Sequence, residues 1–210
     1  RQGREPEAKR EYLAALSGNP AFRTSPHGEL VRDVMVRHHL AAARALDEAG
    51  YPDGALDRYQ QVLDLGARDT EKSLAYNNYA WLLVDRLNRD LPKAERYVNE
   101  ALRLAPDHPA YLDTLAWIYY KTGRHEQALS TQLRAMQEPH WLLRVAGEDP
   151  RSAEMYYHLA AIYERLGKRE EARENYTRAL ERQPDYPAAR EGLRGLSDPD
   201  DPDAGRERRP

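Results

Sequence analysis

Residues 156–184 have the sequence YYHLAAIYERLGKREEARENYTRALERQP, which contains two helical patterns in succession. In each pattern alanine and aromatic residues recur at spacings of three and four, which is the period of an amphipathic α-helix. The first pattern consists of Tyr156, Ala160 and Tyr163, and the second consists of Ala172, Tyr176 and Ala179. Gly167 lies between them and Pro184 follows the second, and these residue types end helices. The stretch therefore predicts a helical hairpin.

The same spacing recurs along the chain, which indicates an internal repeat. The first-helix alanines are Ala43, Ala80, Ala116 and Ala160, and the second-helix alanines are Ala8, Ala55, Ala94, Ala128 and Ala172. Gln132 stands where the repeat expects an aromatic residue. The second unit has two extra residues between its alanines, and Asn88 is the residue there that is suited to a positive φ. Since one hairpin cannot bury its apolar face alone, we expect neighbouring hairpins to stack.

These residues resemble the tetratricopeptide repeat, whose unit has the order large, small, aromatic, glycine, alanine, aromatic, alanine, proline. The resemblance extends from Gly3 to Pro184, and the unit from Tyr156 to Pro184 matches at every anchor. It implies an all-α, right-handed α-solenoid of helical hairpins that acts in protein–protein interaction. Arginine greatly outnumbers lysine among the 32 basic residues, which suggests a GC-rich bacterial source.

The repeat spacing predicts the organisation of the whole chain. Residues 1–20 are the second helix of a truncated or capping repeat, 21–35 a linker and helix start, 36–69 repeat 1, 70–108 repeat 2, 109–138 repeat 3, 139–150 an inserted segment, 151–185 repeat 4, 186–196 a C-terminal solvating helix, and 197–210 a disordered tail. Within the linker, residues 21–30 contain Pro26 and Gly28 and are expected to form a loop. We expect further repeats before residue 1, with a capping helix as the alternative.

Composition limits the class of protein. The chain has 210 residues, of which 40% are hydrophobic and 32% charged, so a soluble protein is expected. A chain without cysteine suits the cytoplasm and the periplasm equally, so the sequence leaves the compartment unknown. Its apolar runs are far shorter than the roughly 20 residues that a membrane helix needs. The formal net charge of −3 argues against general nucleic-acid binding. The absence of cysteine excludes disulfides and thiolate metal ligands.

No catalytic or cofactor motif is present in the sequence. His38 and His39 are adjacent, so on a helix they point about 100° apart and cannot chelate one ion together. The sequence has no HExxH motif, no histidine pair at i, i+4 and no glycine-rich phosphate loop. We therefore expect no catalytic residues, no metal and no cofactor, with the histidines solvated or at the edge of the core.

By the resemblance, the first helices line a concave groove that holds a partner. The residues assigned to this groove are Leu40, Arg44, Asn77, Trp81, Asp113, Trp117, Tyr120, Tyr157 and Glu164. Trp81 and Trp117 occupy equivalent places in successive units, where they would form an aromatic floor of the kind that anchors partners. The alternative is that both tryptophans pack between hairpins as core. A second apolar patch, formed by Trp141, Leu142 and Val145, either contacts a partner or fills the gap opened by its own insertion.

The residues assigned to the groove also indicate which kind of ligand it binds. Some relatives bind a C-terminal carboxylate through a clamp of lysine, arginine and asparagine. Here only Arg44 and Asn77 resemble that clamp, while Asp113 and Tyr157 stand where positive charge would help. We therefore expect an apolar or helical segment of a protein partner, bound by a non-catalytic scaffold. A regulatory or docking module of a larger protein, and a self-assembling structural protein, remain alternatives.

Overall fold

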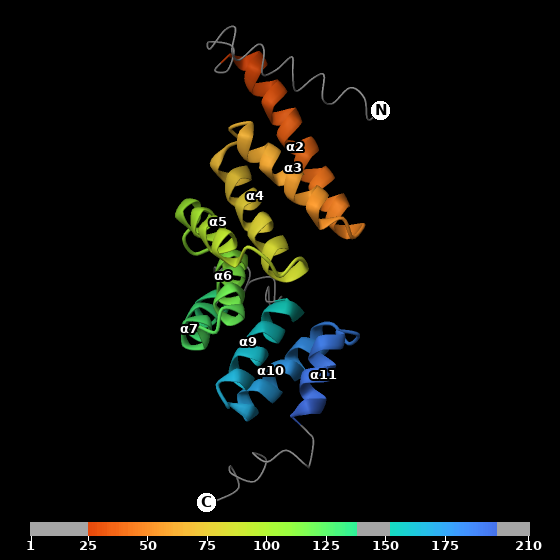
Figure 1. Ribbon diagram of the computed structural model, residues 1–210, viewed down its shortest axis with the longest axis vertical. Coiled ribbons are helices and arrows are strands. Elements are labelled where there is room, and N and C mark those ends of the chain that lie inside the picture. Colours follow the sequence, from red (N-terminus) through yellow and green to blue (C-terminus); the bar gives the residue numbers. More distant parts are fainter. Residues whose placement is uncertain (1–24, 138–151, 197–210) are drawn as a thin grey trace, which may run out of the picture. The chain divides into compact units, whose positions relative to one another are not determined.

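The computed structural model describes residues 25–137 and 152–196, and all regular elements in these ranges are helices (Figure 1). The all-α fold class is thereby confirmed. The expectations for residues 1–20, 139–150 and 197–210, including Trp141, Leu142 and Val145, lie outside the described residues. The chain divides into two compact units, residues 1–105 and 106–210, which are described separately below. No helix in the described ranges has the length and apolar character needed to cross a membrane.

Within residues 25–105, unit 1 contains two helical hairpins. Its elements are α2 (Pro26–Glu48), α3 (Pro52–Asp64), α4 (Asp69–Trp81), the π-helical turn η2 (Leu82–Arg86) and α5 (Leu91–Leu104). Helix α2 packs against α3, and α4 packs against α5. The two hairpins stack through contacts of α3 with α4, as Figure 1 shows.

The described residues of unit 2, 106–137 and 152–196, form two further hairpins and one more helix. The elements are α6 (Pro109–Lys121), α7 (His125–Ala135), α9 (Ala153–Arg165), α10 (Arg169–Arg182) and α11 (Pro187–Gly195). The hairpins α6–α7 and α9–α10 stack through contacts of α7 with α9, and α11 covers α10 and α9. Helix α11 buries Ala189, while Leu196, the residue after the helix, is also buried, and Arg190 and Arg194 are exposed. This is the division expected of a helix that shields the end of a repeat array.

The anchor alanines lie at the helix crossings, as their spacing predicts. The fully buried anchors, each with 0% exposure, are Ala43, Ala55, Ala80, Ala94, Ala116, Ala128, Ala160 and Ala172. A methyl side chain at these positions lets two helix backbones approach closely, and larger side chains fill the space on either side. The core of each unit is therefore set by the same pair of positions in every hairpin.

The longer turn of the second hairpin is absorbed by a π-helical turn and a left-handed loop. In η2 the backbone N–H of Leu87 donates to the carbonyl of Leu82 at 3.0 Å, five residues earlier. A π-helical turn accommodates one extra residue without breaking the helix. Asn88 then has φ 45° and Asp90 has φ 51°. The positive φ expected at Asn88 is confirmed, while the π-helical turn was not predicted.

Helix α2 starts earlier than the sequence suggested. The expectation of a loop over residues 21–30 is wrong for residues 26–30, which form its first turn. Ser25 caps the helix, because its Oγ accepts a hydrogen bond from the backbone N–H of Gly28 at 3.1 Å. Pro26 is compatible with this start, since an N–H at the first helical position has no partner within the helix.

Candidate functional site

The structure divides the predicted groove residues by exposure. The half-buried or exposed members are Leu40, Arg44, Trp81, Tyr120, Tyr157 and Glu164. Asn77, Asp113 and Trp117 are 6%, 5% and 4% exposed, so their assignment to the groove surface is corrected, and they lie beneath it. Trp81 belongs to unit 1 and Trp117 to unit 2, so the aromatic floor that would join them stays a prediction.

In unit 2 the predicted residues belong to one packed aromatic cluster, which consists of Trp117, Tyr120, Tyr157, His158 and Tyr176. The Trp117 ring stacks on Tyr120 at 4.6 Å and on His158 at 4.1 Å between centroids. Tyr157 contacts Trp117 at 5.9 Å and Tyr176 at 6.0 Å. Tyr120 and Tyr157 are only half-buried, so they form the accessible edge of the cluster.

A buried polar network joins α6, α7 and α9 behind this cluster. Nδ1 of His158 lies 3.0 Å and 3.1 Å from the two carboxylate oxygens of Asp113. Nε2 of Gln132 donates to Oδ1 of Asp113 at 2.6 Å and to the backbone carbonyl of Met155 at 3.1 Å. Because His158 also stacks on Trp117, the network holds the aromatic cluster in place.

The His158–Asp113 pair has the chemistry of an acid–base dyad but not its accessibility. His158 is 1% exposed and Asp113 is 5% exposed, so a substrate cannot reach either group in this conformation. Within residues 25–137 and 152–196, no group of three or more His, Cys, Asp or Glu is arranged to hold a metal ion. The geometry therefore fits a structural role for this pair.

Sequence reasoning missed His158 and Gln132 as members of the site. One signal was available, because Gln132 occupies the second-helix position held by Tyr59 and Tyr176 in other repeats. A buried amide at an aromatic position requires a hydrogen-bonding partner nearby. Asp113 supplies that partner from the preceding helix of the same hairpin.

Tyr176 connects the aromatic cluster to the exposed residue Glu164. Its hydroxyl donates to Oε2 of Glu164 at 2.6 Å. Burial of the phenol, followed by the hydrogen bond to this carboxylate, raises the pKa of Tyr176 well above its usual value. The neutral form of Tyr176 is thus the form that the folded protein holds.

This raised pKa predicts a loss of stability at alkaline pH. Above about pH 10 the unfolded chain ionises Tyr176 while the folded chain does not, so the free energy of unfolding falls as the pH rises. Replacing the residue, Tyr176→Phe, should reduce that fall by at most about 1.4 kcal/mol per pH unit. Urea unfolding followed by circular dichroism between about pH 8 and 11 measures how the free energy of unfolding changes with pH in the wild type and in Tyr176→Phe.

The control for this experiment is Tyr51→Phe, because Tyr51 is 65% exposed. Tyr51→Phe should show the same fall of the free energy of unfolding with pH as the wild-type chain. If Tyr176→Phe also shows the wild-type fall, ionisation of Tyr176 is not linked to folding.

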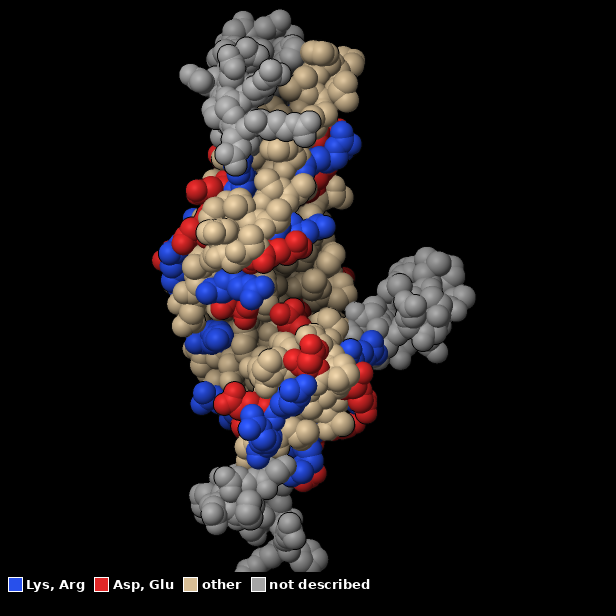
Figure 2. Space-filling model, turned by 90° about the vertical axis from the view of Figure 1, so that its right-hand side faces the viewer, with Lys and Arg blue, Asp and Glu red and all other residues tan. Residues whose placement is uncertain are grey.

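The surface around the cluster edge carries charges of both signs. Nζ of Lys121 lies 5.0 Å from the Trp117 ring centroid, and Nε of Arg165 lies 3.5 Å from the Tyr120 hydroxyl. On the face shown in Figure 2, basic and acidic side chains are interspersed over the described residues. The exposed carboxylate of Glu164 on α9 adds a negative charge to the two cations Lys121 and Arg165, so the charges near the aromatic edge are of both signs.

Comparison with protein families identifies the repeats. Family models described as tetratricopeptide repeat match residues 86–141 and residues 153–186. A TPR repeat-containing protein of Pseudomonas aeruginosa is 34% identical over 71 residues, which cover 34% of this chain. The matched stretch is 12% of that relative's length. Its bacterial source agrees with the one suggested by the composition.

Solved structures show the same fold. A chain of the APC/C hetero-tetramer Cut9–Hcn1 matches with a TM-score of 0.63 at 14% identity, over 93% of this chain and 40% of that one. A MamA fragment from Desulfovibrio magneticus RS-1 matches with a TM-score of 0.55 at 16% identity, over 78% and 84% of the two chains. Together with the repeating alanines and the helical hairpins, the family matches show that residues 86–141 and 153–186 are tetratricopeptide repeats.

Proposed function

We propose that this chain is a non-catalytic scaffold that binds an apolar or helical segment of a partner protein on the first-helix face of unit 2. The observation that carries the proposal is the accessible edge of the aromatic cluster, formed by Tyr120 and Tyr157. A tetratricopeptide-repeat chain is a protein-interaction module, and the proposal adds where this one binds and what it binds.

Rigidity of the surface supports binding at this edge. Tyr120 stacks on Trp117, whose ring is held in turn by His158 and the buried polar network. Side chains that are already ordered lose little conformational entropy when a partner docks. Tyrosines also offer large contact area with a polar tip, which is why they often anchor protein interfaces.

The border of the edge supports an amphipathic ligand. Lys121 and Arg165 lie beside Trp117 and Tyr120, and the carboxylate of Glu164 is exposed nearby on α9. An apolar stripe on a partner helix would cover the tyrosines, while its flanking polar residues would meet these charges.

One observation favours a second candidate role, that of a docking module within a larger protein. The matched stretch spans 12% of the Pseudomonas relative, so related repeats occur within a much longer chain. In that role the surface formed by Tyr120 and Tyr157 would bind a partner of the longer protein to which the repeats belong.

A selected peptide tests the proposed site. A displayed library of random peptides is panned on the wild-type chain, and the recovered peptides are titrated by fluorescence polarisation. The double variant Tyr120→Ala/Tyr157→Ala should raise the Kd at least about ten-fold, because each truncated anchor contributes on the order of 1 kcal/mol or more. Circular dichroism establishes that the variant is folded.

The matched control is Tyr51→Ala/Leu30→Ala, since these side chains are 65% and 58% exposed on unit 1. It should bind the selected peptides with wild-type affinity. Equal affinities for all three chains would place the binding site away from Tyr120 and Tyr157.

A further inference from the structure

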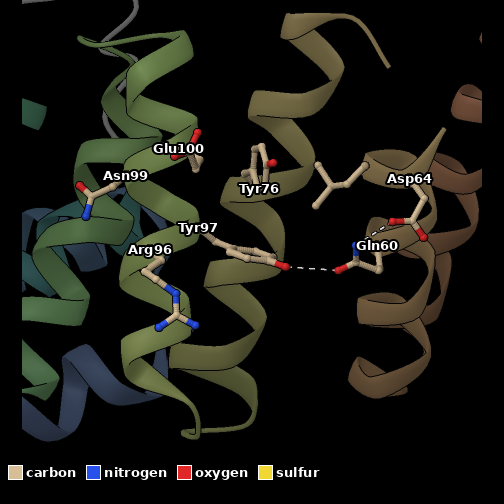
Figure 3. Close-up of a pocket in the computed structure, with 8 residues that line it drawn as sticks. Gln60, Asp64, Tyr76, Arg96, Tyr97, Asn99 and Glu100 are labelled. Carbon is tan, nitrogen blue, oxygen red and sulfur yellow. Dashed lines mark hydrogen bonds between the residues drawn. The ribbon is translucent and has the colours of Figure 1, made fainter. Parts of the chain in front are cut away.

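The second helices of unit 1 enclose a hollow that the proposed function does not use. It lies between α3 and α5, over one side of α4, and has a volume of about 680 Å³ (Figure 3). The polar and aromatic residues that line it are Gln60, Asp64, Tyr76, Arg96, Tyr97, Asn99 and Glu100. The groove predicted from the sequence lies on the first helices, so this hollow is a separate feature.

Its aromatic wall is ordered by contacts between the helices. The Tyr97 hydroxyl donates to Oε1 of Gln60 at 3.3 Å, which joins α5 to α3. Tyr76 meets the Tyr97 ring edge to face, with 5.3 Å between centroids. Nε2 of Gln60 donates to Oδ1 of Asp64 at 3.0 Å. Figure 3 shows Tyr76 between Glu100 and Asp64 in this view of the hollow.

The carboxylates of the hollow are available to a cation. Asp64 is exposed, and its Oδ1 accepts from the neutral side-chain amide of Gln60 at 3.0 Å. Glu100 accepts from Arg103 at 3.0 Å, but this pair is on the surface and contributes little. The guanidinium of Arg96 points away from Asp64 and Tyr76 (Figure 3).

One ring of the hollow, Tyr97, already contacts a cation of the chain, Lys93, which does not itself line the hollow. Nζ of Lys93 lies 4.5 Å from the Tyr79 ring centroid and 5.2 Å from the Tyr97 ring centroid. Such contacts arise because the face of an aromatic ring is electron-rich. Tyr76 offers a further ring of the same kind inside the hollow.

The equivalent hollow of unit 2 lacks this combination. It lies between α7 and α10 and has a volume of about 480 Å³. At the repeat positions of Asp64, Tyr97 and Glu100 it has Gln137, Asn175 and Arg178. Its own carboxylates, Glu171 and Glu174, have Lys168 at 3.9 Å and Arg178 at 2.6 Å. The unit 2 hollow also has carboxylates and a tyrosine, Tyr163, but it lacks the counterpart of Tyr97 and both of its carboxylates are ion-paired.

We propose that the unit 1 hollow binds an arginine side chain presented by an extended segment of a partner protein. A guanidinium is planar, so it can stack on Tyr76, and the carboxylates of Asp64 on α3 and Glu100 on α5 offer charged acceptors for its N–H groups on either side of that ring. The site lies on a different unit and a different helix face from Tyr120 and Tyr157. A partner could thus engage both sites or only one.

A short peptide of defined chemistry tests this site. Acetyl-Gly-Arg-Gly-amide is titrated into the ¹⁵N-labelled full chain, and amide shifts are followed by NMR. We expect saturable shifts that centre on the hollow, with a Kd on the order of 1 mM for a single side chain. The citrulline peptide has the same shape without the charge, and it should bind at least about five-fold more weakly.

Neutral variants of the two carboxylates provide the second arm. Asp64→Asn/Glu100→Gln should weaken binding of the arginine peptide at least about five-fold, because both charged acceptors are lost. The control Asp57→Asn/Asp69→Asn changes the net charge equally at two exposed residues that do not line the hollow, and it should bind as wild type. If the double variant does not fold, Asp64→Asn alone is tested with the same expectation.

Two results would overturn the proposal. One is equal binding of the arginine and citrulline peptides, and the other is equal binding by the carboxylate variant and its control. Tyr120→Ala/Tyr157→Ala should leave the arginine titration unchanged, so failure of the proposed peptide site and failure of this site are distinguishable.

Discussion

The substitution Asp113→Ala is expected to lower the free energy of unfolding by about 3 kcal/mol or more. Asp113 is 5% exposed, and its carboxylate accepts from Gln132 at 2.6 Å and contacts Nδ1 of His158 at 3.0 Å. Removing the carboxylate takes the acceptor away from two side chains that are themselves almost fully buried. Water cannot readily replace the carboxylate at a site this buried, so the donors of Gln132 and His158 stay without that acceptor and the free energy of unfolding falls accordingly.

Urea unfolding of the full chain measures this loss, with Asp107→Ala as the control. Asp107 lies in the same unit, but its side chain is 91% exposed and its pairing with Arg134 spans 3.4 Å. That exposed pair should contribute less than about 1 kcal/mol. Asp113→Asn keeps one acceptor oxygen, so its free energy of unfolding should lie between those of Asp113→Ala and Asp107→Ala. If Asp113→Ala were as stable as Asp107→Ala, the buried network would not hold α6, α7 and α9 together.

The fold was largely predictable because its determinants are local. The spacing of three and four between alanines and aromatic residues is a property of a single helix, and the eight anchor alanines within the described residues are all buried, as this spacing predicts. The positive φ of Asn88 followed from the same kind of reasoning about one turn. The start of α2 was missed because a proline was taken to indicate a loop, whereas Pro26 occupies the first helical position after a serine cap.

The candidate site was less predictable because the burial of a side chain depends on other helices, and not only on the sequence around it. A repeat position places a residue on a face of a helix, but it does not say what covers that face. Asp113 and Trp117 occupy groove positions by spacing, yet His158 from α9 packs over both. Asp113 and His158 are 45 residues apart in the chain, so their contact depends on how two hairpins stack. Tyr120 and Tyr157 kept the exposure that their positions suggested.

A further large effect is expected at the C-terminal helix, where Gly192→Ala should destabilise the chain by about 1–3 kcal/mol. A Cβ at residue 192 would lie 2.7 Å from both Cε atoms of Tyr176, which is closer than such atoms approach. Tyr176 is 2% exposed, its hydroxyl is bonded to Glu164, and its ring contacts Tyr157. Because the ring has little room to move, α11 would have to shift away from α10.

The direction of the stability change in Gly192→Ala separates a steric clash from the effect of helix propensity. Alanine is normally better than glycine inside a helix by about 1 kcal/mol, so propensity alone predicts that Gly192→Ala is stabilising. Gly195 lies in the same helix, and a Cβ there would meet nothing within 4 Å. Gly195→Ala should therefore be neutral or slightly stabilising in the same thermal and urea unfolding experiments. Opposite signs for the two substitutions would show that α11 is held against the Tyr176 ring, whereas a stabilising Gly192→Ala would mean that this helix does not pack on the aromatic cluster.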